Sequence, residues 1–160
     1  MSIEDLYRTY FQDLYAYLLS LSRNRHITEE LLQETFYRAY IHLDSYRGEN
    51  PKPWLFKIAY HTFIDWTRSE KKWHQQEITE AMLPTVQSTE QIFLTQAKIN
   101  NWLRIVQQLP LTKRHAILLR DYYGFSYEEI SWFLNLTIAN VKVILHRTRK
   151  EVRKRLGEEE

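Results

Sequence analysis

The sequence predicts an all-α protein with two small helical domains joined by a flexible linker. The 160 residues include only three glycines and few runs in which β-branched residues alternate with polar ones, which argues against a sheet. Apolar residues instead recur at helical spacing on both sides of residues 72–89, a polar stretch where that periodicity stops. We therefore expect one domain at 1–71, a linker at 72–97 and a second domain at 98–157.

The first domain is expected to contain three helices. The first helix begins after Ser2, whose hydroxyl can accept a hydrogen bond from a backbone N–H in the first turn. Thr28 is expected to cap the second helix, because two glutamates follow it where the helix dipole favours acids. That helix runs to about Leu43. A loop over 44–53 with one glycine and two prolines then leads to a third helix over 54–69.

The second domain is also expected to be helical. Helices are predicted to start at Ser88, at Thr112 and at Ser126, and Gly124 is expected to end the helix that precedes the last start. Glu129 lies three residues after Ser126, which is the spacing of a capping box.

Residues 126–156 have the pattern of a helix-turn-helix. The short first helix ends at Leu134, and Asn135 follows at a sharp turn that needs a left-handed residue. The second helix is expected to bury a stripe formed by Val141, Leu145, Thr148 and Val152. Its other face presents Ala139, Lys142, Val143, His146, Arg147 and Lys150. This pattern predicts insertion into the major groove of DNA, and a solvated basic helix in an ordinary bundle is the alternative.

The charge distribution agrees with a DNA-binding end. The formal net charge is +2, with ten basic and ten acidic side chains in residues 1–72 but eleven basic and four acidic ones in residues 100–157. A basic surplus on one segment attracts phosphate, and such binding weakens steeply with salt.

The composition also excludes several classes of protein. The chain is 44% hydrophobic, which is too apolar for a disordered protein, and the absence of cysteine excludes disulfide scaffolds, thiolate metal sites and a cysteine nucleophile. No apolar run approaches the about 20 residues of a membrane span, and residues 1–10 lack the apolar core of a signal peptide. We expect a cytoplasmic protein without a metal ion or cofactor.

Several motifs occur in a characteristic order. The first domain contains Leu32-Gln33-Glu34-Thr35-Phe36, Tyr46-Arg47-Gly48-Glu49, Trp54-Leu55-Phe56-Lys57-Ile58-Ala59 and Ile64-Asp65. The second contains Ser126-Tyr127-Glu128-Glu129-Ile130, Val141-Lys142 and Leu145-His146-Arg147-Thr148-Arg149. In this order the motifs strongly resemble the extracytoplasmic-function sigma factors, the small sigma subunits of bacterial RNA polymerase. The resemblance covers about residues 3–71 and 98–156.

The resemblance implies an alternative sigma factor with no chemical step of its own. Residues 1–71 would be sigma region two, which binds core polymerase and recognises and melts the −10 element. Residues 98–157 would be sigma region four, which recognises the −35 element. The implied partners are core RNA polymerase (the coiled coil of its largest subunit and its flap), promoter DNA and an anti-sigma factor. The family also implies an envelope or stress response, and a linker that runs through polymerase toward the RNA path.

The resemblance implies three sets of site residues. The set for core-polymerase binding is Leu32, Gln33, Glu34, Phe36 and Arg38, of which we expect Gln33 and Glu34 to point outward. The set for −10 recognition and melting is Lys57, Tyr60, His61, Thr62, Asp65 and Arg68. The set for −35 recognition is Lys142, Val143, His146, Arg147 and Lys150.

The predicted third helix has more aromatic residues than a single buried stripe uses: Trp54, Phe56, Tyr60, Phe63 and Trp66. We expect an inward face of Leu55, Ile58, Ala59, Thr62 and Trp66. The remaining aromatic side chains would then face outward and stack on unpaired bases. The alternative is that the aromatic residues belong to the core.

Two positions depart from the family pattern. His61 stands where many relatives have Asn, which affects the expected −10 preference. Val143 and Ile144 replace a Ser-Arg pair that is common in relatives. Val143 cannot hydrogen-bond a base edge but can pack on a thymine methyl group, which leaves Lys142, His146 and Arg147 as the expected polar readers.

Other classes of function are less well supported. A stand-alone transcriptional regulator and a helical adaptor without DNA contact are both possible for a helical chain, but the motifs between residues 30 and 59 favour the sigma factor. An enzyme is not expected, because the six histidines are scattered and there is no glycine-rich phosphate loop. His26, Glu29 and Glu30 could suggest a metal site, but acids in a first helical turn explain them more simply.

Overall fold

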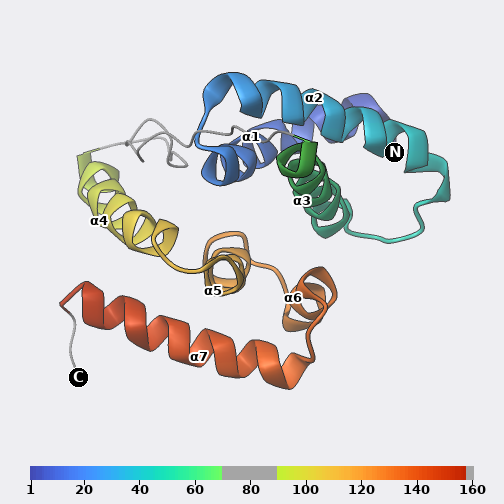
Figure 1. Ribbon diagram of the computed structural model, residues 1–160. Coiled ribbons are helices and arrows are strands. Elements are labelled where there is room, and N and C mark those ends of the chain that lie inside the picture. The colour runs from blue at the N-terminus through green and yellow to red at the C-terminus, as the bar shows by residue number, and fades with distance from the viewer. Residues whose placement is uncertain (70–89, 158–160) are drawn as a thin grey trace. The chain divides into compact units, whose positions relative to one another are not determined.

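A computed structural model shows two compact units, Met1–Pro84 and Thr85–Glu160 (Figure 1). The structure describes residues 1–69 and 90–157, and over these ranges it contains helices and no strands, as expected. Residues 72–89 of the predicted linker, Ser88 among them, lie outside the described residues. The first helix of the second unit begins at Glu90, inside the range predicted as linker.

Within residues 1–69, the first unit contains three α-helices that all pack on one another. They are α1 (Ile3–Ser22), α2 (Arg25–His42) and α3 (Pro51–Ser69), and a 3₁₀ turn over Leu43–Ser45 follows α2. Tyr17 of α1 and Phe56 of α3 are fully buried, with ring centroids 4.7 Å apart, and the aliphatic side chains of all three helices surround them. The core therefore lies where the three helices meet.

The two helix caps predicted in this unit have different outcomes. The prediction for Ser2 is confirmed, because its hydroxyl accepts a hydrogen bond from the backbone N–H of Asp5 at 3.2 Å. The prediction that Thr28 caps α2 was wrong. Asn24 is the cap and accepts from the N–H of Ile27, while Thr28 is buried and its hydroxyl lies 2.7 Å from that of Ser22. Helix α2 starts early because only two residues connect it to α1.

Helix α3 also begins earlier than expected, at Pro51 instead of Trp54. Both prolines of the predicted loop lie in its first turn, where a missing backbone N–H breaks no helical hydrogen bond. The side chain of Asn50 accepts from the N–H of Lys52 at this helix start. The loop is therefore shorter than predicted.

Burial on α3 is wider than a single stripe. Leu55, Ala59 and Thr62 are buried as expected, whereas Ile58 and Trp66 are only partly buried. The expectation that Phe56 and Phe63 face outward was wrong, because both are buried. The reason is that α3 packs against α1 and α2 together, so two neighbouring faces of the helix enter the core.

Within residues 90–157, the second unit contains four α-helices. They are α4 (Glu90–Gln107), α5 (Leu111–Ile117, one residue before the start predicted at Thr112), α6 (Tyr127–Leu134) and α7 (Ile138–Arg155). A π-helical turn over Leu118–Tyr122 extends α5, and Gly124, with a φ of 77°, lies in the segment between that turn and α6. Helix α7 packs against α4, α5 and α6, so its inner face forms much of the core of the unit.

The helix-turn-helix prediction is confirmed in its local details. Ser126 and Glu129 form the capping box, with hydrogen bonds of 2.8 and 3.0 Å. Asn135 is left-handed, with φ 57° and ψ 47°, and α6 ends before it at Leu134. The hydroxyl of Ser131 donates to the carbonyl of Leu136 and so closes the turn. The predicted inward stripe of α7 is buried at all four positions: Val141, Leu145, Thr148 and Val152.

Candidate nucleic-acid and polymerase interfaces

The outer face of α7 presents all five residues predicted to recognise the −35 element. Lys142, Val143, His146, Arg147 and Lys150 are exposed. They lie one, three or four residues apart, so the helical period places them on one face, opposite the buried stripe. The start of this helix is fixed by Thr137, whose hydroxyl accepts from the N–H of Asn140 at 3.1 Å.

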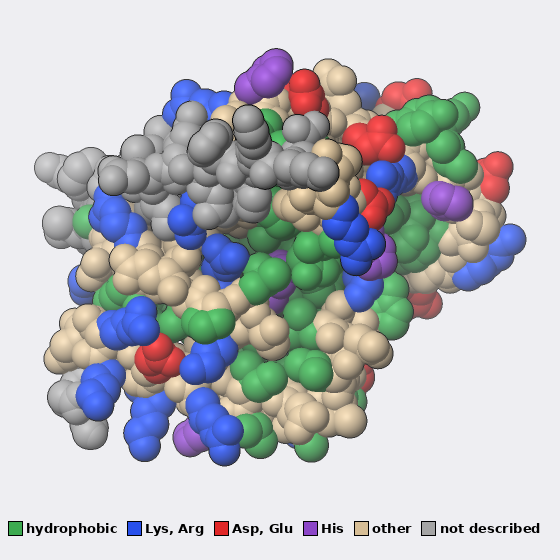
Figure 2. All heavy atoms as spheres, in the orientation of Figure 1, with side chains coloured by type: hydrophobic (Ala, Val, Ile, Leu, Met, Phe, Trp, Pro, Cys, Tyr) green, Lys and Arg blue, Asp and Glu red, His purple; other side chains and the backbone are tan. Residues whose placement is uncertain are grey.

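Most cations of α7 form no ion pair with the side chains that the structure describes. Of the seven, Arg149 pairs with Asp121 at 2.5 Å and Arg155 pairs with Glu151 at 2.7 Å. Among the side chains that the structure describes, those of residues 1–69 and 96–157, no ion pair forms to the other five: Lys142, Arg147, Lys150, Arg153 and Lys154. Figure 2 shows blue side chains gathered over α7 along the lower edge of the view. This surface attracts a polyanion.

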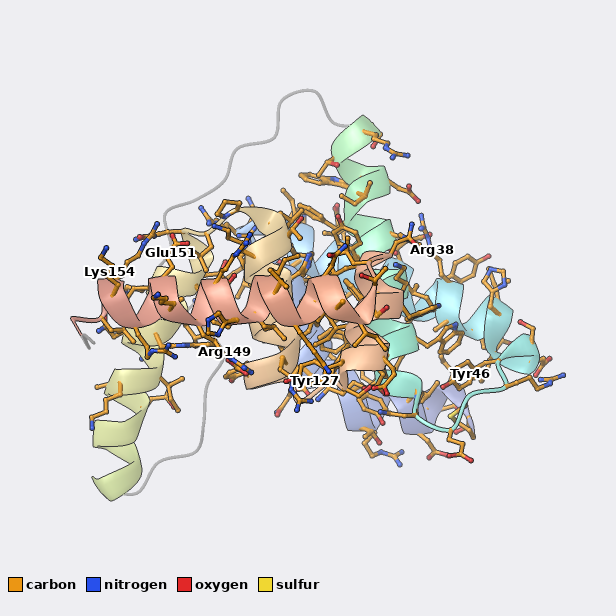
Figure 3. The ribbon with its side chains drawn as sticks, turned by 90° about the horizontal axis from the view of Figure 1, so that it is seen from below. Arg38, Tyr46, Tyr127, Arg149, Glu151 and Lys154 are labelled. Atoms are coloured by element: carbon orange, nitrogen blue, oxygen red, sulfur yellow. The ribbon has the colours of Figure 1, made fainter. Side chains whose placement is uncertain are left out.

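Tyr127, the first residue of α6, connects that helix to the outer face of α7. Its ring lies 4.5 Å from the guanidinium carbon of Arg120 and 5.5 Å from the Nζ of Lys142. Arg120 in turn donates to the carbonyl of Phe125 at 2.8 Å. The aromatic ring therefore supports one of the predicted reading side chains (Figure 3), a role that sequence reasoning missed.

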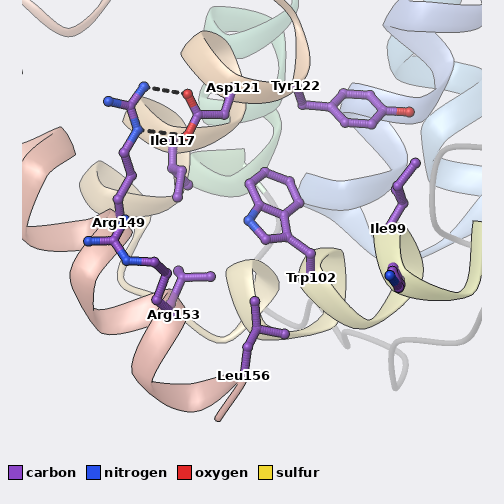
Figure 4. Close-up of a pocket in the computed structure, with 10 residues that line it drawn as sticks. Ile99, Trp102, Ile117, Asp121, Tyr122, Arg149, Arg153 and Leu156 are labelled. Atoms are coloured by element: carbon purple, nitrogen blue, oxygen red, sulfur yellow. Dashed lines mark hydrogen bonds and ion pairs between the residues drawn. The ribbon is translucent and has the colours of Figure 1, made fainter. Parts of the chain in front are cut away.

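A second face of α7 lines a pocket of about 560 Å³ shared with α4 and the end of α5. Trp102 reaches into it from α4, and the Asp121–Arg149 ion pair lies at its edge (Figure 4). The hydrogen bond to Asp121 raises the pKa of Arg149 above its ordinary value. The five predicted −35 residues lie outside this lining, so α7 divides its charged side chains between two faces.

In the first unit, the residues predicted to bind polymerase lie on α2 and differ in burial. Leu32 and Phe36 are buried, whereas Gln33 and Glu34 are exposed, as expected. The buried pair belongs to the core, so of these four residues only the polar pair is available to a partner.

Sequence reasoning missed an apolar stripe beside that polar pair. Tyr37, Tyr40 and Ile41 are each more than half exposed. They continue the face of Gln33 and Glu34 at spacings of three and four residues, so the signal was present in the helical period. Between residues 33 and 41, the exposed side chains of α2 are thus two polar and three large apolar ones.

Arg38 joins α2 to α3 through two carboxylates. Its Nε donates to Glu34 and its Nη1 donates to Asp65, both at 2.9 Å (Figure 3). The hydrogen bond to Glu34, with that to Asp65, raises the pKa of Arg38 despite partial burial. One ion network therefore connects two residues of the predicted polymerase-binding set with one residue of the −10 set.

The residues predicted for −10 recognition mostly share the outer face of α3. Lys57 and Tyr60 are partly buried, while His61, Asp65 and Arg68 are exposed. Thr62 does not lie on this face. It is 2% exposed, and its hydroxyl donates to the carbonyl of Ile58 at 2.8 Å.

The surroundings of His61 on the outer face of α3 favour the neutral form of its imidazole. Burial, with the positive charge of Lys57 as the next cause, lowers the pKa of His61, although Asp65 acts in the opposite direction. Burial also lowers the pKa of Lys57 itself. Both shifts reflect partial desolvation of the middle of α3.

The loop before α3 is held in a closed shape by Tyr46. Its ring stacks on Trp54, with centroids 4.5 Å apart, and its hydroxyl donates to the carbonyl of Asn50 at 2.7 Å. A Cβ atom at Gly48 would overlap the Tyr46 ring, so this position needs glycine. Four residues of the Tyr46–Asn50 segment are exposed beside the start of α3.

Two further features concern the metal site and the membrane span that were considered from the sequence. Nε2 of His26 lies 3.3 Å from a carboxylate oxygen of Glu30, one helical turn away on the surface of α2. None of the helices within the described ranges combines the length and the apolar character that crossing a membrane requires.

Comparisons with known proteins match both units. The family Sigma-70 region 2 matches residues 6–73, and the family Sigma-70, region 4 matches residues 99–152. The chain is 37% identical to the ECF RNA polymerase sigma factor SigM of Bacillus subtilis, over 96% of this chain and 94% of that relative. It is 35% identical to the RNA polymerase sigma factor YlaC of the same organism, over 97% of this chain and 92% of that relative.

Solved structures show a similar fold. The sigma factor RpoE from Bartonella quintana, solved in complex with the anti-sigma factor NepR, aligns with a TM-score of 0.73 at 24% identity and covers 96% of both chains. CnrH, solved in complex with the cytosolic domain of CnrY, aligns with a TM-score of 0.67 at 19% identity, over 99% of this chain and 89% of that one.

Proposed function

The chain belongs to the extracytoplasmic-function sigma factors of RNA polymerase, and we propose that its α2, α3 and α7 surfaces bind core enzyme, the −10 element and the −35 element respectively. As a member of this family it is a non-catalytic initiation subunit. It binds core RNA polymerase and promoter DNA and directs promoter-specific transcription.

The proposed division of the chain places sigma region two at 1–71, a linker at 72–97 and sigma region four at 98–157. The family matches at 6–73 and 99–152 support the two outer segments. Within this division, α4 begins before the proposed start of region four, at Glu90.

The observation that carries the proposal is the uncompensated positive face of α7. Five of its seven cations form no ion pair within the described ranges, and its start is fixed by the capped turn of the helix-turn-helix. Lys142, His146 and Arg147 can donate hydrogen bonds to base edges, while Lys150 supplies charge for the phosphate backbone. We assign this face to duplex DNA at the −35 element.

The proposed polymerase-binding surface has a different chemistry. Exposed Gln33 and Glu34 lie beside Tyr37, Tyr40 and Ile41, which suits packing against another helix with polar contacts at the rim. A coiled coil in the largest polymerase subunit is such a partner. Leu32 and Phe36 support this surface from the core, and Arg38 holds Glu34 in place.

The outer face of α3 is proposed to bind the −10 element as the duplex opens. Lys57 and Arg68 supply positive charge, Tyr60 offers a ring for stacking, and His61 and Asp65 offer hydrogen-bonding groups. Thr62 contributes from the core, as a support for this face of the helix.

Further partners follow from the family and from a structural neighbour. An anti-sigma factor is proposed because the structure of RpoE was solved with the anti-sigma factor NepR. We also propose a contact between region four and the polymerase flap, a linker path through polymerase toward the RNA, a cytoplasmic location, and a role in an envelope or stress response.

Reconstitution with bacterial core polymerase tests the proposal. The holoenzyme is expected to give promoter-specific run-off transcription from a library of promoter fragments, and failure to bind core would refute it. Glu34→Lys should weaken core binding because it reverses a charge on the α2 surface and breaks the ion pair to Arg38. Glu29→Lys, the same charge reversal at another exposed position of this helix, is the matched control. Equal core affinities of the two variants would contradict the α2 assignment.

A further inference from the structure

Apolar side chains interrupt the cationic face of α7. Val143 is 45% exposed, Ile138 is 38% exposed, and Ala139 is also exposed. Ala139 and Val143 lie four residues apart, so they are neighbours on one face of the helix, beside Lys142 and His146. An exposed apolar pair among the residues predicted to recognise the −35 element is suited to contact with an apolar group of the ligand.

The protein does not use Val143 for its own packing. The core-facing positions on either side of it, Val141 and Leu145, are at most 1% exposed and complete the buried stripe. Ile144 is partly buried, so of the two adjacent branched residues only Val143 stands on the outer face. Its methyl groups are therefore available to a ligand that approaches α7.

The major groove of DNA has one apolar feature, the C5-methyl group of thymine. Valine and alanine cannot hydrogen-bond the base edges, but their methyl groups can pack against that methyl group. Cations that contact phosphate, such as Lys150, hold the helix on the backbone without regard to sequence, so base choice depends on the side chains that reach the base edges.

We propose that Ala139 and Val143 form a thymine-methyl reader that selects thymine at one or two positions of the −35 element. The inference rests on the proposed function of α7 as the −35 reading helix. Burial of one methyl group corresponds to about a fourfold change in affinity. Each contacted thymine should therefore be preferred over uracil, which lacks only that methyl group, by about this factor.

The test begins with a selection. Holoenzyme reconstituted from the full chain and core polymerase selects duplexes from a library randomised across the −35 element. If no sequence is enriched, the −35 assignment itself is overturned, and the reader with it. If a sequence is enriched, each thymine in it is replaced in turn by deoxyuridine, and the affinity of the holoenzyme for each duplex is measured.

The expected result is a loss of about fourfold in affinity at one or two thymines. Equal affinity for thymine and deoxyuridine at every position would overturn the reader while leaving the −35 assignment intact. This measurement uses the unmodified protein, so it does not depend on the folding of any variant.

A matched pair of variants then assigns the effect to Val143. Val143→Ala should reduce the thymine preference at one position to less than twofold, since two methyl groups are lost from an exposed site. Lys150→Ala should weaken binding of the thymine and deoxyuridine duplexes by the same factor, because a phosphate contact carries no base information. A Val143→Ala variant that keeps the full preference would overturn the assignment.

Discussion

The exposed faces of α2 and α7 belong to two helices of equal length but differ in how many of their charged side chains form ion pairs. On α2 the arginine of the predicted site is held by two carboxylates, and the exposed surface is completed by two tyrosines and an isoleucine. On α7 only two of seven cations are paired with a carboxylate, and the others have no ion-pair partner among the described residues. One face is compensated and partly apolar, while the other is cationic.

The difference indicates two kinds of partner. A compensated, aromatic surface loses little hydration energy when it is covered by a protein, whereas an uncompensated cationic surface is suited to phosphate. The net charge of +2 is therefore a sum that hides the difference between two surfaces suited to different partners. It also agrees with a subunit that acquires most of its DNA affinity inside the holoenzyme.

The largest effect is expected from a cavity in the core of the second unit. Leu145 is 1% exposed, and Leu145→Ala should cost about 2–5 kcal/mol of stability. Hydrogen exchange should show lost amide protection in α5, α6 and α7 and unchanged protection in α1, α2 and α3. Ile138→Ala, at an exposed position of the same helix, serves as the control. Equal losses in both units would show that the two cores are not independent.

The next effect concerns the face of α7. The double variant Lys142→Ala with Arg147→Ala should weaken promoter binding by at least about tenfold, because each base contact contributes about 1–3 kcal/mol. Arg153→Ala with Lys154→Ala removes the same amount of charge at two other positions of α7 whose side chains form no ion pair among the described residues. Titrations of promoter binding against salt should show a smaller loss of affinity for this control. Both double variants should bind core polymerase with unchanged affinity. Identical losses would mean that α7 contributes charge alone.

A smaller effect is expected from the Arg38 network. Arg38→Ala should lower the free energy of unfolding by up to about 1 kcal/mol, since both ion pairs are partly exposed. Arg38→Lys keeps the charge but lacks the planar fork that reaches two carboxylates, so it should recover only part of the loss. Chemical denaturation measures both values. Full stability of Arg38→Lys would argue that charge alone matters at this position.

The smallest effect is a pH dependence of the first unit. The pKa of His61 is lowered in the folded state, so the unfolded chain binds the proton more readily. The contribution of His61 to stability is therefore complete above its ordinary pKa of 6.5 and declines as the pH falls below it. Urea midpoints at about pH 8 and about pH 5.5 should differ less in His61→Asn than in the unmodified protein. An unchanged difference would exclude His61 as its source.

The helix-turn-helix could be predicted from the sequence because its determinants are local. The Ser126–Glu129 box, the left-handed Asn135 and the buried stripe of α7 each depend on residues within a few positions of one another. The start of α2 could not be predicted in this way. Asn24 and Thr28 are both good caps, and the choice depends on the buried contact between Thr28 and Ser22 of α1.

The motifs also identified the family, and they placed most predicted site residues on helix faces that prove to be exposed. Thr62 differs, because the resemblance placed it in the −10 set although the helical period put it on the inward face, where it is buried. Phe56 and Phe63 are core residues and not base-stacking ones for another reason: a helical period shows which residues share a face but not how many faces the neighbouring helices cover.

The sequence by itself determined the helical class, the two-part organisation, the caps at Ser2 and Ser126 and the cationic helix, since each depends on spacing along one segment. Only the tertiary structure decided that Arg38 is held by Glu34 and Asp65, that Tyr127 supports Lys142, and that Ile144 is partly covered. These outcomes depend on which surfaces of different helices meet, and that pairing is set by packing across the whole unit.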